Sequence, residues 1–246
     1  MAVTGLLLAL VSIVVAQWWH GGSLSVLADG PALLIVFGGT LGAALIQTPW
    51  RQCKVAFQAL LSIWKRPNWP FNEQASRLLH WSHQARQEGF LVLESRLEHH
   101  SLDDFTRQGL QWVVDGTEPL ALEQLLDNQL DALEEEKELE ARFFEAMGGY
   151  SPTIGIIGAV LGLIQAMSNL DDPAQLGAGI AVAFVATLYG VGLANLFLLP
   201  VANRLRANYR LQLRYHELTA VGLLAIARGD SSLMVSRQLG QYQGPF

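Results

Sequence analysis

The stretch SPTIGIIGAVLGLIQAMSNL, residues 151–170, decides the fold of this chain, because its twenty residues include no Asp, Glu, Lys or Arg. A helix needs about 20 mostly apolar residues to cross a bilayer. Three more stretches lack these charges, namely residues 1–28, 31–50 and 173–203. Within the four stretches we expect four membrane-spanning helices, at residues 2–18, 31–48, 153–168 and 176–199.

Charged residues are concentrated outside these stretches. They make up 15% of the 246 residues, whereas soluble domains carry about 25%, and most of them lie in residues 51–150. The formal net charge of −6 argues against a nucleic-acid surface, which would show clustered Lys and Arg. We therefore expect an all-α membrane protein with a helical cytoplasmic domain between its second and third spans.

The distribution of Lys and Arg predicts the orientation in the membrane. Basic residues follow the second and the fourth span, whereas the short links within each pair of spans carry acidic residues and no basic ones. Both basic ends, and with them both termini, are expected in the cytoplasm. The predicted organisation is two spans in 1–50, a cytoplasmic helical domain in 51–150, two spans in 151–203, and a cytoplasmic helix and tail in 204–246.

The first stretch could also be a secretory signal peptide. It has no basic segment at its start and no clear small-residue cleavage site before Gln17, so we favour a span. Cys53, the single cysteine, excludes a disulfide within the chain. The pairs His80 with His83 and His99 with His100 lack a third ligand at useful spacing. We expect no metal site, no cofactor and no enzymatic activity.

Apolar spacing predicts further helices in the polar region. One long helix is expected over residues 118–144, and the fourth span is expected to continue into the cytoplasm as far as Gly229 and Asp230. Pro152 is expected to open the third span, whereas Pro200 lies within the continuing helix, where a proline bends the chain. Residues between 71 and 116 recur at threes and fours and are expected on buried helix faces: Leu78, Leu79, Trp81, Phe90, Leu91, Leu93 and Leu97.

Two features of the spans bear on function. Gly155, Gly158 and Gly162 form a stripe of small residues, so the third span should pack closely against another helix. The four spans contain no Asp, Glu, His, Lys or Arg. A carrier of protons or ions normally places such a residue in the membrane. If this chain takes part in ion transfer, another chain must supply the acid.

Three segments resemble the MotA/PomA family, the A-type stator subunits of the bacterial flagellar motor, with most similarity to its MotC-like branch. They are PALLIVFGGT at 31–40, SPTIGIIGAVLGLI at 151–164 and AFVATLYGVGLAN at 183–195. The segment GLLAIARGD at 222–230 resembles the family's ending. The resemblance follows the family order over nearly the whole chain.

The resemblance implies a mechanism. In this family five A subunits surround two MotB-like B subunits, each of which contributes an aspartate on one membrane helix. Protonation of that aspartate drives the A ring to rotate in the bacterial inner membrane, and the ring turns the rotor through the protein FliG. The implied partners are a B subunit, FliG, further copies of this chain and membrane lipid, with no nucleic acid.

The resemblance also implies roles for particular residues. Pro152 and Pro200 match the family prolines that are linked to ion flow and coupling, and Arg86 and Glu94 match the charged pair that meets FliG. Sodium-driven relatives carry a threonine where this chain has Ala159, while Thr187 is kept. Because alanine cannot replace a sodium ion's hydration shell, we expect the transported ion to be a proton, with sodium less favoured.

Three other functions compete with this one. An ExbB/TolQ-like energy transducer of the same superfamily would have three spans, with the cytoplasmic segment after the first. A small-molecule transporter or channel would show charged membrane residues or interrupted, inverted repeats. A passive membrane scaffold would not need Pro152 or Pro200. The two spans expected before the cytoplasmic domain favour the stator.

Overall fold

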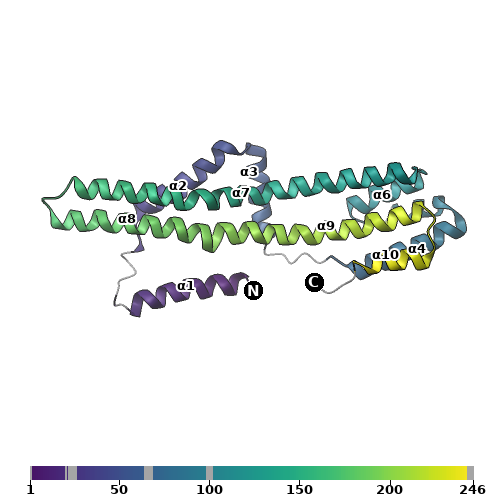
Figure 1. Cartoon of the computed structure of the whole chain (residues 1–246), viewed down its shortest axis with the longest axis horizontal. Coiled ribbons are helices and arrows are strands. Elements are labelled where there is room, and N and C mark those ends of the chain that lie inside the picture. Colours follow the sequence, from purple (N-terminus) through teal and green to yellow (C-terminus); the bar gives the residue numbers. More distant parts are fainter. Residues whose placement is uncertain (1, 20, 22–26, 64–68, 98–101, 243–246) are drawn as a thin grey trace. The chain divides into compact units, whose positions relative to one another are not determined.

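The computed structural model describes residues 2–19, 21, 27–63, 69–97 and 102–242 (Figure 1). The described residues form helices and turns without any β-strand, which confirms the all-α fold. The helices are α1 (Ala2–Trp19), α2 (Gly30–Gln47), α3 (Trp50–Ser62), α4 (Phe71–Glu88), the 3₁₀ turn η2 (Phe90–Leu93), α5 (Glu94–Leu97), α6 (Asp104–Val114), α7 (Pro119–Met167), α8 (Pro173–Leu193), the π-helical η3 (Ala194–Leu198), α9 (Leu199–Ala227) and α10 (Ser232–Gly240).

The chain divides into two compact units. Unit 1 consists of Met1–Trp64 and Leu139–Arg206, and unit 2 consists of Lys65–Glu138 and Ala207–Phe246. These limits differ from the predicted organisation, because residues 51–64 and 139–150 group with the apolar helices of unit 1. The predicted limits follow the distribution of charged residues, whereas the two units are defined by packing. The predicted limits therefore stay a prediction.

Three helical stretches among the described residues are long and apolar enough to cross a membrane. They are Gly30–Gln47, Pro119–Met167 and Pro173–Ala227. The apolar part of α1, Thr4–Trp19, is shorter than these. Pro152 lies inside the 49-residue helix α7, so no helix begins at it. The level at which the third span enters the membrane stays a prediction. The expected continuation of the fourth span is confirmed, and α9 ends just before Gly229, whose φ is +69°.

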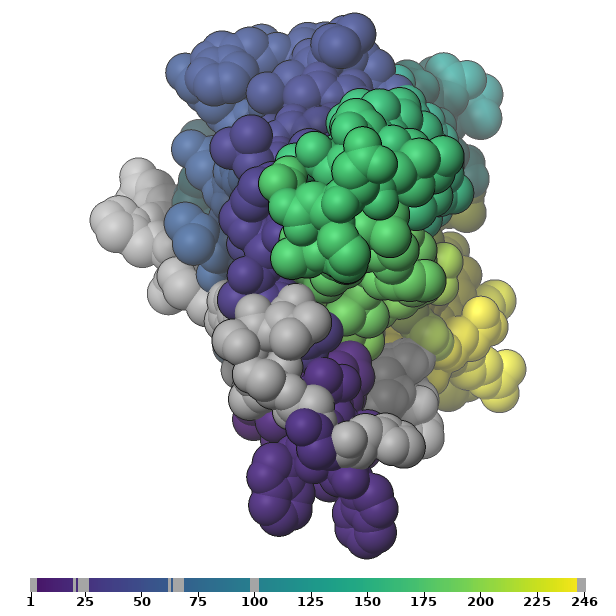
Figure 2. Space-filling model, turned by 90° about the vertical axis from the view of Figure 1, so that its left-hand side faces the viewer, coloured from purple at the N-terminus to yellow at the C-terminus, as the bar shows by residue number. Residues whose placement is uncertain are grey.

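In unit 1, α7 and α8 pack backbone against backbone. A Cβ atom built at Gly155 would lie 2.9 Å from the carbonyl oxygen of Ala186, and one built at Gly162 would lie 2.9 Å from that of Gly179. The hydroxyl of Ser151 donates to the carbonyl of Gly190 at 2.9 Å. The predicted close packing of the glycine stripe is therefore confirmed, and its partner is α8. Figure 2 views the molecule with the link between these helices, in green, toward the reader.

Helix α2 packs on this pair. Ala32 and Val36 share a buried cluster with Val185 and Ala186 of α8. The start of α2 is fixed by Asp29, whose side chain accepts a hydrogen bond from the N–H of Ala32 at 2.7 Å. Pro31 stands in its first turn, as expected, where the missing N–H leaves no helical bond unmade. At the other end, the hydroxyl of Tyr150 donates to the side chain of Gln47 at 2.7 Å.

The outer faces of α7 and α8 in unit 1 stay apolar and exposed, with Ile156, Ile157, Val160, Leu161 and Ile164 on α7 and Phe184 and Leu188 on α8 among them. An apolar surface of this kind on a stable protein marks a contact with lipid or with another protein.

Unit 2 has a separate core. Its centre consists of side chains that are fully buried or nearly so and come from α4, α6, α7, α9 and α10: Leu78, Leu110, Leu122, Leu126, Leu218, Leu223 and Leu239. Helix α10 packs on α4. One helix and a tail were expected after residue 204, but part of that tail forms a second helix, α10.

The close contact of α7 with α8 gives a test at Gly190. A Cβ atom there would lie 2.6 Å from the backbone carbonyl oxygen of Ser151, which cannot move without the helix. We expect Gly190→Ala to destabilise the protein by about 1–3 kcal/mol. The measurement is the thermal unfolding of the detergent-solubilised chain, where the midpoint should fall by several degrees.

Gly192 on the same helix provides the matched control. It has no atom within 4 Å of a built Cβ, and alanine favours a helix over glycine by about 1 kcal/mol. Gly192→Ala should therefore leave the midpoint unchanged or raise it. Equal effects of the two substitutions would contradict the packing described for Gly190.

Candidate functional site

The register of α7 on α8 brings two of the predicted pathway residues to one level. Gly158 packs on Ala186, and Ala159 and Thr187 are the next residues on the two helices. Both are half-buried. The Thr187 hydroxyl donates to the carbonyl of Ala183, one turn back, at 3.2 Å. At this level the chain therefore offers one hydroxyl oxygen from α8 and only a methyl group from α7.

Pro152 and Pro200 each interrupt the hydrogen bonding of a helix, and the two interruptions lie close together. Pro152 has no N–H to donate to the carbonyl of Gly148, four residues earlier. Gly148 in turn packs against Leu198 and Leu199, the residues just before Pro200. The two breaks thus meet where α7 crosses the junction of η3 with α9.

The chain before Pro200 widens into a π-helical turn. The N–H of Leu199 bonds to the carbonyl of Ala194, five residues earlier instead of four. Single π turns of this kind are frequent at functional sites and at kinks. The bend predicted at Pro200 therefore has an identifiable local structure in η3.

Tyr189 ties the link before α2 to α8, a role that the sequence analysis did not assign. Its hydroxyl donates to the carbonyl of Leu27 and accepts from the N–H of Asp29, the latter at 3.2 Å. It stands two residues after Thr187 on α8. A tyrosine within a span is a visible signal, but its backbone partners lie more than a hundred residues away and could not be inferred.

The far link of unit 1, between α7 and α8, ends in an acidic cap. The side chain of Asp172 accepts from the N–H of Ala174 at 3.0 Å. Hydrogen bonds from the Gln175 side chain, and then from the N–H groups of Gln175 and Ala174, hold the pKa of Asp172 below its ordinary value. This link therefore carries a carboxylate at neutral pH.

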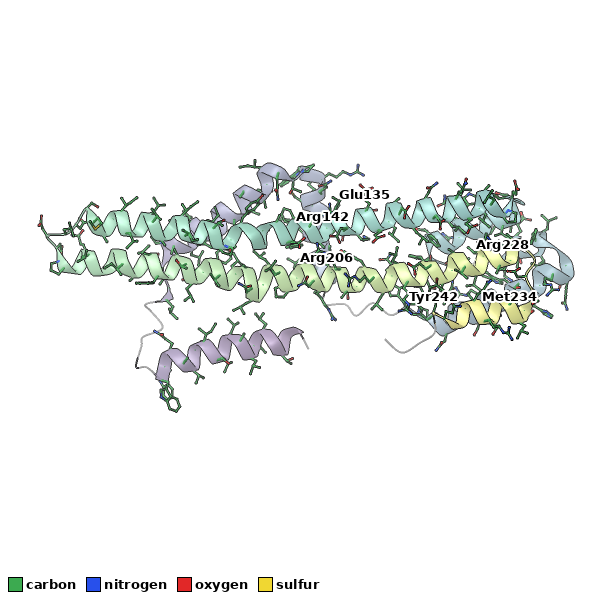
Figure 3. All side chains as sticks on the ribbon, in the orientation of Figure 1. Glu135, Arg142, Arg206, Arg228, Met234 and Tyr242 are labelled. Atoms are coloured by element: carbon green, nitrogen blue, oxygen red, sulfur yellow. The ribbon has the colours of Figure 1, made fainter. Side chains whose placement is uncertain are left out.

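An ion pair in unit 1 lies in the middle of α7. Arg206 of α9, labelled in Figure 3, donates through Nη1 to the carboxylate of Glu145 of α7 at 3.2 Å. Lys54 lies over the ring of Trp50 in α3, with its Nζ 5.6 Å from the ring centroid. These charged residues lie outside the uncharged segments 151–170 and 173–203, which hold Ala159 and Thr187.

The predicted rotor-contact residues lie in unit 2, on either side of a sharp turn. Arg86 is in the last turn of α4 and Glu94 is the first residue of α5. Both side chains are exposed. Gly89 separates them with a φ of +86°, a conformation that favours glycine. In the described part of the chain no ion pair engages either residue.

A buried polar network joins three helices of unit 2. The amide of Gln74 in α4 donates to the hydroxyls of Thr106 in α6, at 3.2 Å, and Thr219 in α9, at 3.0 Å. All three side chains are fully buried. Satisfied networks of this kind specify one arrangement of helices. No local pattern in the sequence predicts it, because single polar residues on amphipathic helices resemble surface positions.

His216 of α9 extends this network with an unsatisfied atom. Its Nδ1 has no hydrogen-bond partner among the described residues and lies 3.6 Å from Oδ1 of Asp103, the N-cap of α6. The ring is enclosed by Trp69, Phe105 and Tyr215. Burial lowers the pKa of His216, and the nearby carboxylate of Asp103 opposes that effect.

Comparisons with known proteins identify the family of this chain. Residues 97–217 match the MotA/TolQ/ExbB proton channel family, which defines the class of membrane protein. Residues 3–88 match the N-terminal region of motility protein A. The chain belongs to the motility protein A family and is a flagellar stator subunit. The match of 3–88 favours this branch over the ExbB/TolQ-like alternative.

Individual relatives agree with this assignment. Motility protein A of Bacillus subtilis is 32% identical over 242 residues, which cover 97% of this chain and 88% of the relative. Chemotaxis protein PomA of Vibrio alginolyticus is 29% identical over 90% of this chain and 87% of its own length.

Solved structures agree as well. The structure of C. jejuni MotAB matches with a TM-score of 0.91 and 28% identity, over 99% of this chain and 95% of that one. The MotAB stator complex of Bacillus subtilis matches with a TM-score of 0.89 and 30% identity, over 98% and 95%. The finer resemblance to the MotC-like branch stays a prediction.

The burial of His216 predicts how the stability of the chain depends on pH. Because its pKa is lower in the folded chain than the ordinary 6.5, the unfolded chain binds more protons as the pH falls through that value. The free energy of unfolding should therefore decrease between about pH 7.5 and about pH 5.5. His216→Phe, which keeps an aromatic ring in the cluster, should reduce this decrease in a thermal unfolding experiment.

The exposed His80 of α4 serves as the control position. His80→Phe should leave the acid-dependent loss of stability as it is in the unsubstituted chain. An equal loss in the unsubstituted chain and in His216→Phe would contradict the role given to the buried imidazole.

Proposed function

We propose that this stator subunit surrounds a MotB-like B subunit and couples inward proton flow to rotation of a ring made of its own copies. The observation that carries the proposal is the lack of Asp, Glu, His, Lys and Arg in residues 30–47, 151–167 and 173–203. These helices can line a path but cannot themselves bind a proton in transit. The titratable carboxylate is therefore assigned to the B subunit.

The proposed arrangement has four spans, formed by α1, α2, the last part of α7, and α8 with the start of α9. Both termini and unit 2 lie in the cytoplasm of a bacterium, and the spans lie in its inner membrane. The excess of Arg and Lys after α2 and near the start of α9 supports this orientation. The links at Asp29 and Asp172 then face outward.

We propose that the aspartate of the B subunit lies at the level of Ala159 and Thr187. Burial of a carboxylate there disfavours its charged form, so its proton is held until the aspartate moves to a more polar level. A sodium ion would need several oxygen ligands in place of water. The methyl group of Ala159 supplies none, and this level of α7 and α8 offers a single hydroxyl oxygen, that of Thr187. The scarcity of oxygen ligands favours the proton.

Pro152 and Pro200 are the proposed coupling elements. Each removes a helical hydrogen bond, and the two breaks lie side by side through Gly148 and Leu199. A helix that lacks internal bonds at one level bends there more easily than elsewhere. We infer that a change of charge at the Ala159 level moves α7 and α9 about this point, in a ring of five copies around two B subunits.

Arg86 and Glu94 are the proposed contact with the rotor protein FliG. Their side chains are exposed, and neither is engaged in an ion pair in the described part of the chain. Two opposite charges held apart on one surface favour a partner with the reverse pattern, which gives orientation as well as attraction.

A rotation assay tests the function directly. In cells whose only stator is this chain with its B subunit, motor rotation should stop when a proton uncoupler is added. It should continue when external sodium is replaced by potassium, because no sodium ligands are proposed. Rotation that follows external sodium and survives the uncoupler would contradict proton coupling.

The same assay separates an active role from a passive scaffold. Pro152→Ala and Pro200→Ala should assemble with the B subunit, measured by co-purification, yet give little or no torque. Normal rotation in both variants would remove the coupling mechanism and leave the chain as a scaffold for its partner.

A further inference from the structure

Leu91 departs from the burial expected of its sequence pattern. The spacing of apolar residues predicts it on a buried face together with Phe90 and Leu93. The structure instead leaves 73% of Leu91 exposed, while Leu93 is fully buried. Among the described residues from 69 to 114, it is the one large apolar side chain that is exposed to this extent. Departures of this kind from a local rule concentrate at functional surfaces.

The turn that displays Leu91 is anchored on both sides. Gly89 ends α4 with its N–H bonded to the carbonyl of Ala85 at 2.9 Å. Phe90 and Val92 pack against the core of unit 2, and the N–H of Glu94 bonds to the carbonyl of Leu91. The hydroxyl of Ser95 donates to the carbonyl of Val92 at 3.1 Å. A turn held this way loses little backbone conformational entropy when a partner binds.

Charged residues flank Leu91 along the chain. Arg86 precedes the turn and Glu94 follows it, and both are exposed. An exposed apolar side chain with exposed charged residues before and after it in the chain fits an interface anchor with a polar rim. The surface of an anionic membrane does not fit, because Glu88 and Glu94 would be repelled by it.

We propose that Leu91 is the apolar anchor of a protein-binding surface whose charged rim is Arg86 and Glu94. Its partner has an apolar pocket between an acidic group, which meets Arg86, and a basic group, which meets Glu94. The inference rests on the proposed function, in which this surface meets the rotor, and it adds that burial of Leu91 supplies much of the affinity. The charged pair orients the contact.

The experiment measures binding of FliG to the purified complex of full-length chain and B subunit. Leu91→Gln keeps the size of the side chain and makes it polar, and since the side chain is exposed the fold should be preserved. The expected result is affinity weaker by about tenfold or more, with a matching loss of torque in cells and unchanged assembly of the complex.

Leu233 of α10 is the matched control. It is 64% exposed and stands next to Met234, which Figure 3 labels. Leu233→Gln makes the same chemical change on another helix of unit 2 and should leave affinity and torque unchanged. An equal loss at Leu233 would overturn the special role of Leu91.

Arg86→Glu and Glu94→Arg separate this inference from the proposed function. If both weaken FliG binding and Leu91→Gln does not, the anchor is wrong and the rotor contact stands. If neither weakens it, the rotor contact at this surface is wrong, whatever Leu91→Gln does. If Leu91→Gln instead disrupts the complex, as judged by size-exclusion chromatography, the side chain binds a second copy and the proposed rotor anchor is overturned.

Discussion

The contact of α7 with α8 through backbone atoms is the constraint on which the rest of unit 1 depends. Gly155 and Gly190 let the two helices approach until a Cβ on either would meet a carbonyl oxygen at 2.9 Å or less. In a membrane, where lipid offers no hydrophobic gain for helix association, such close packing is a principal source of affinity. It fixes the register, and the register sets Ala159 level with Thr187. It also places Gly148 against Leu199, so that the two proline breaks are neighbours.

Much of this arrangement could be predicted from the sequence. Charge-free stretches located α1 and α2 to within a few residues, because the bilayer imposes both length and composition. The helix expected over residues 118–144 and the third apolar stretch instead form the single helix α7. The glycine stripe predicted a tight partner. The identity of that partner, and the bonds from Tyr189 to the link before α2, depend on residues far apart in sequence. No local pattern carries that information.

Pro152, Gln74 and Leu91 show where local rules fail. Proline commonly stands in the first turn of a helix, so Pro152 was expected at the start of the third span, but α7 continues through it from Pro119 to Met167. Gln74 resembles a surface residue until its two threonine partners are known. Leu91 resembles a core residue, and its exposure becomes visible only when the turn at Gly89 is placed.

The central claim is that this chain forms a ring around a B subunit that supplies the only titratable group of the membrane path. The most direct measurement is co-purification with the B subunit, followed by electron microscopy of the complex in lipid. The account predicts five copies around two B helices, with the B aspartate at the level of Ala159 and Thr187. A ring that encloses no partner helix, or an aspartate that faces lipid, would contradict it.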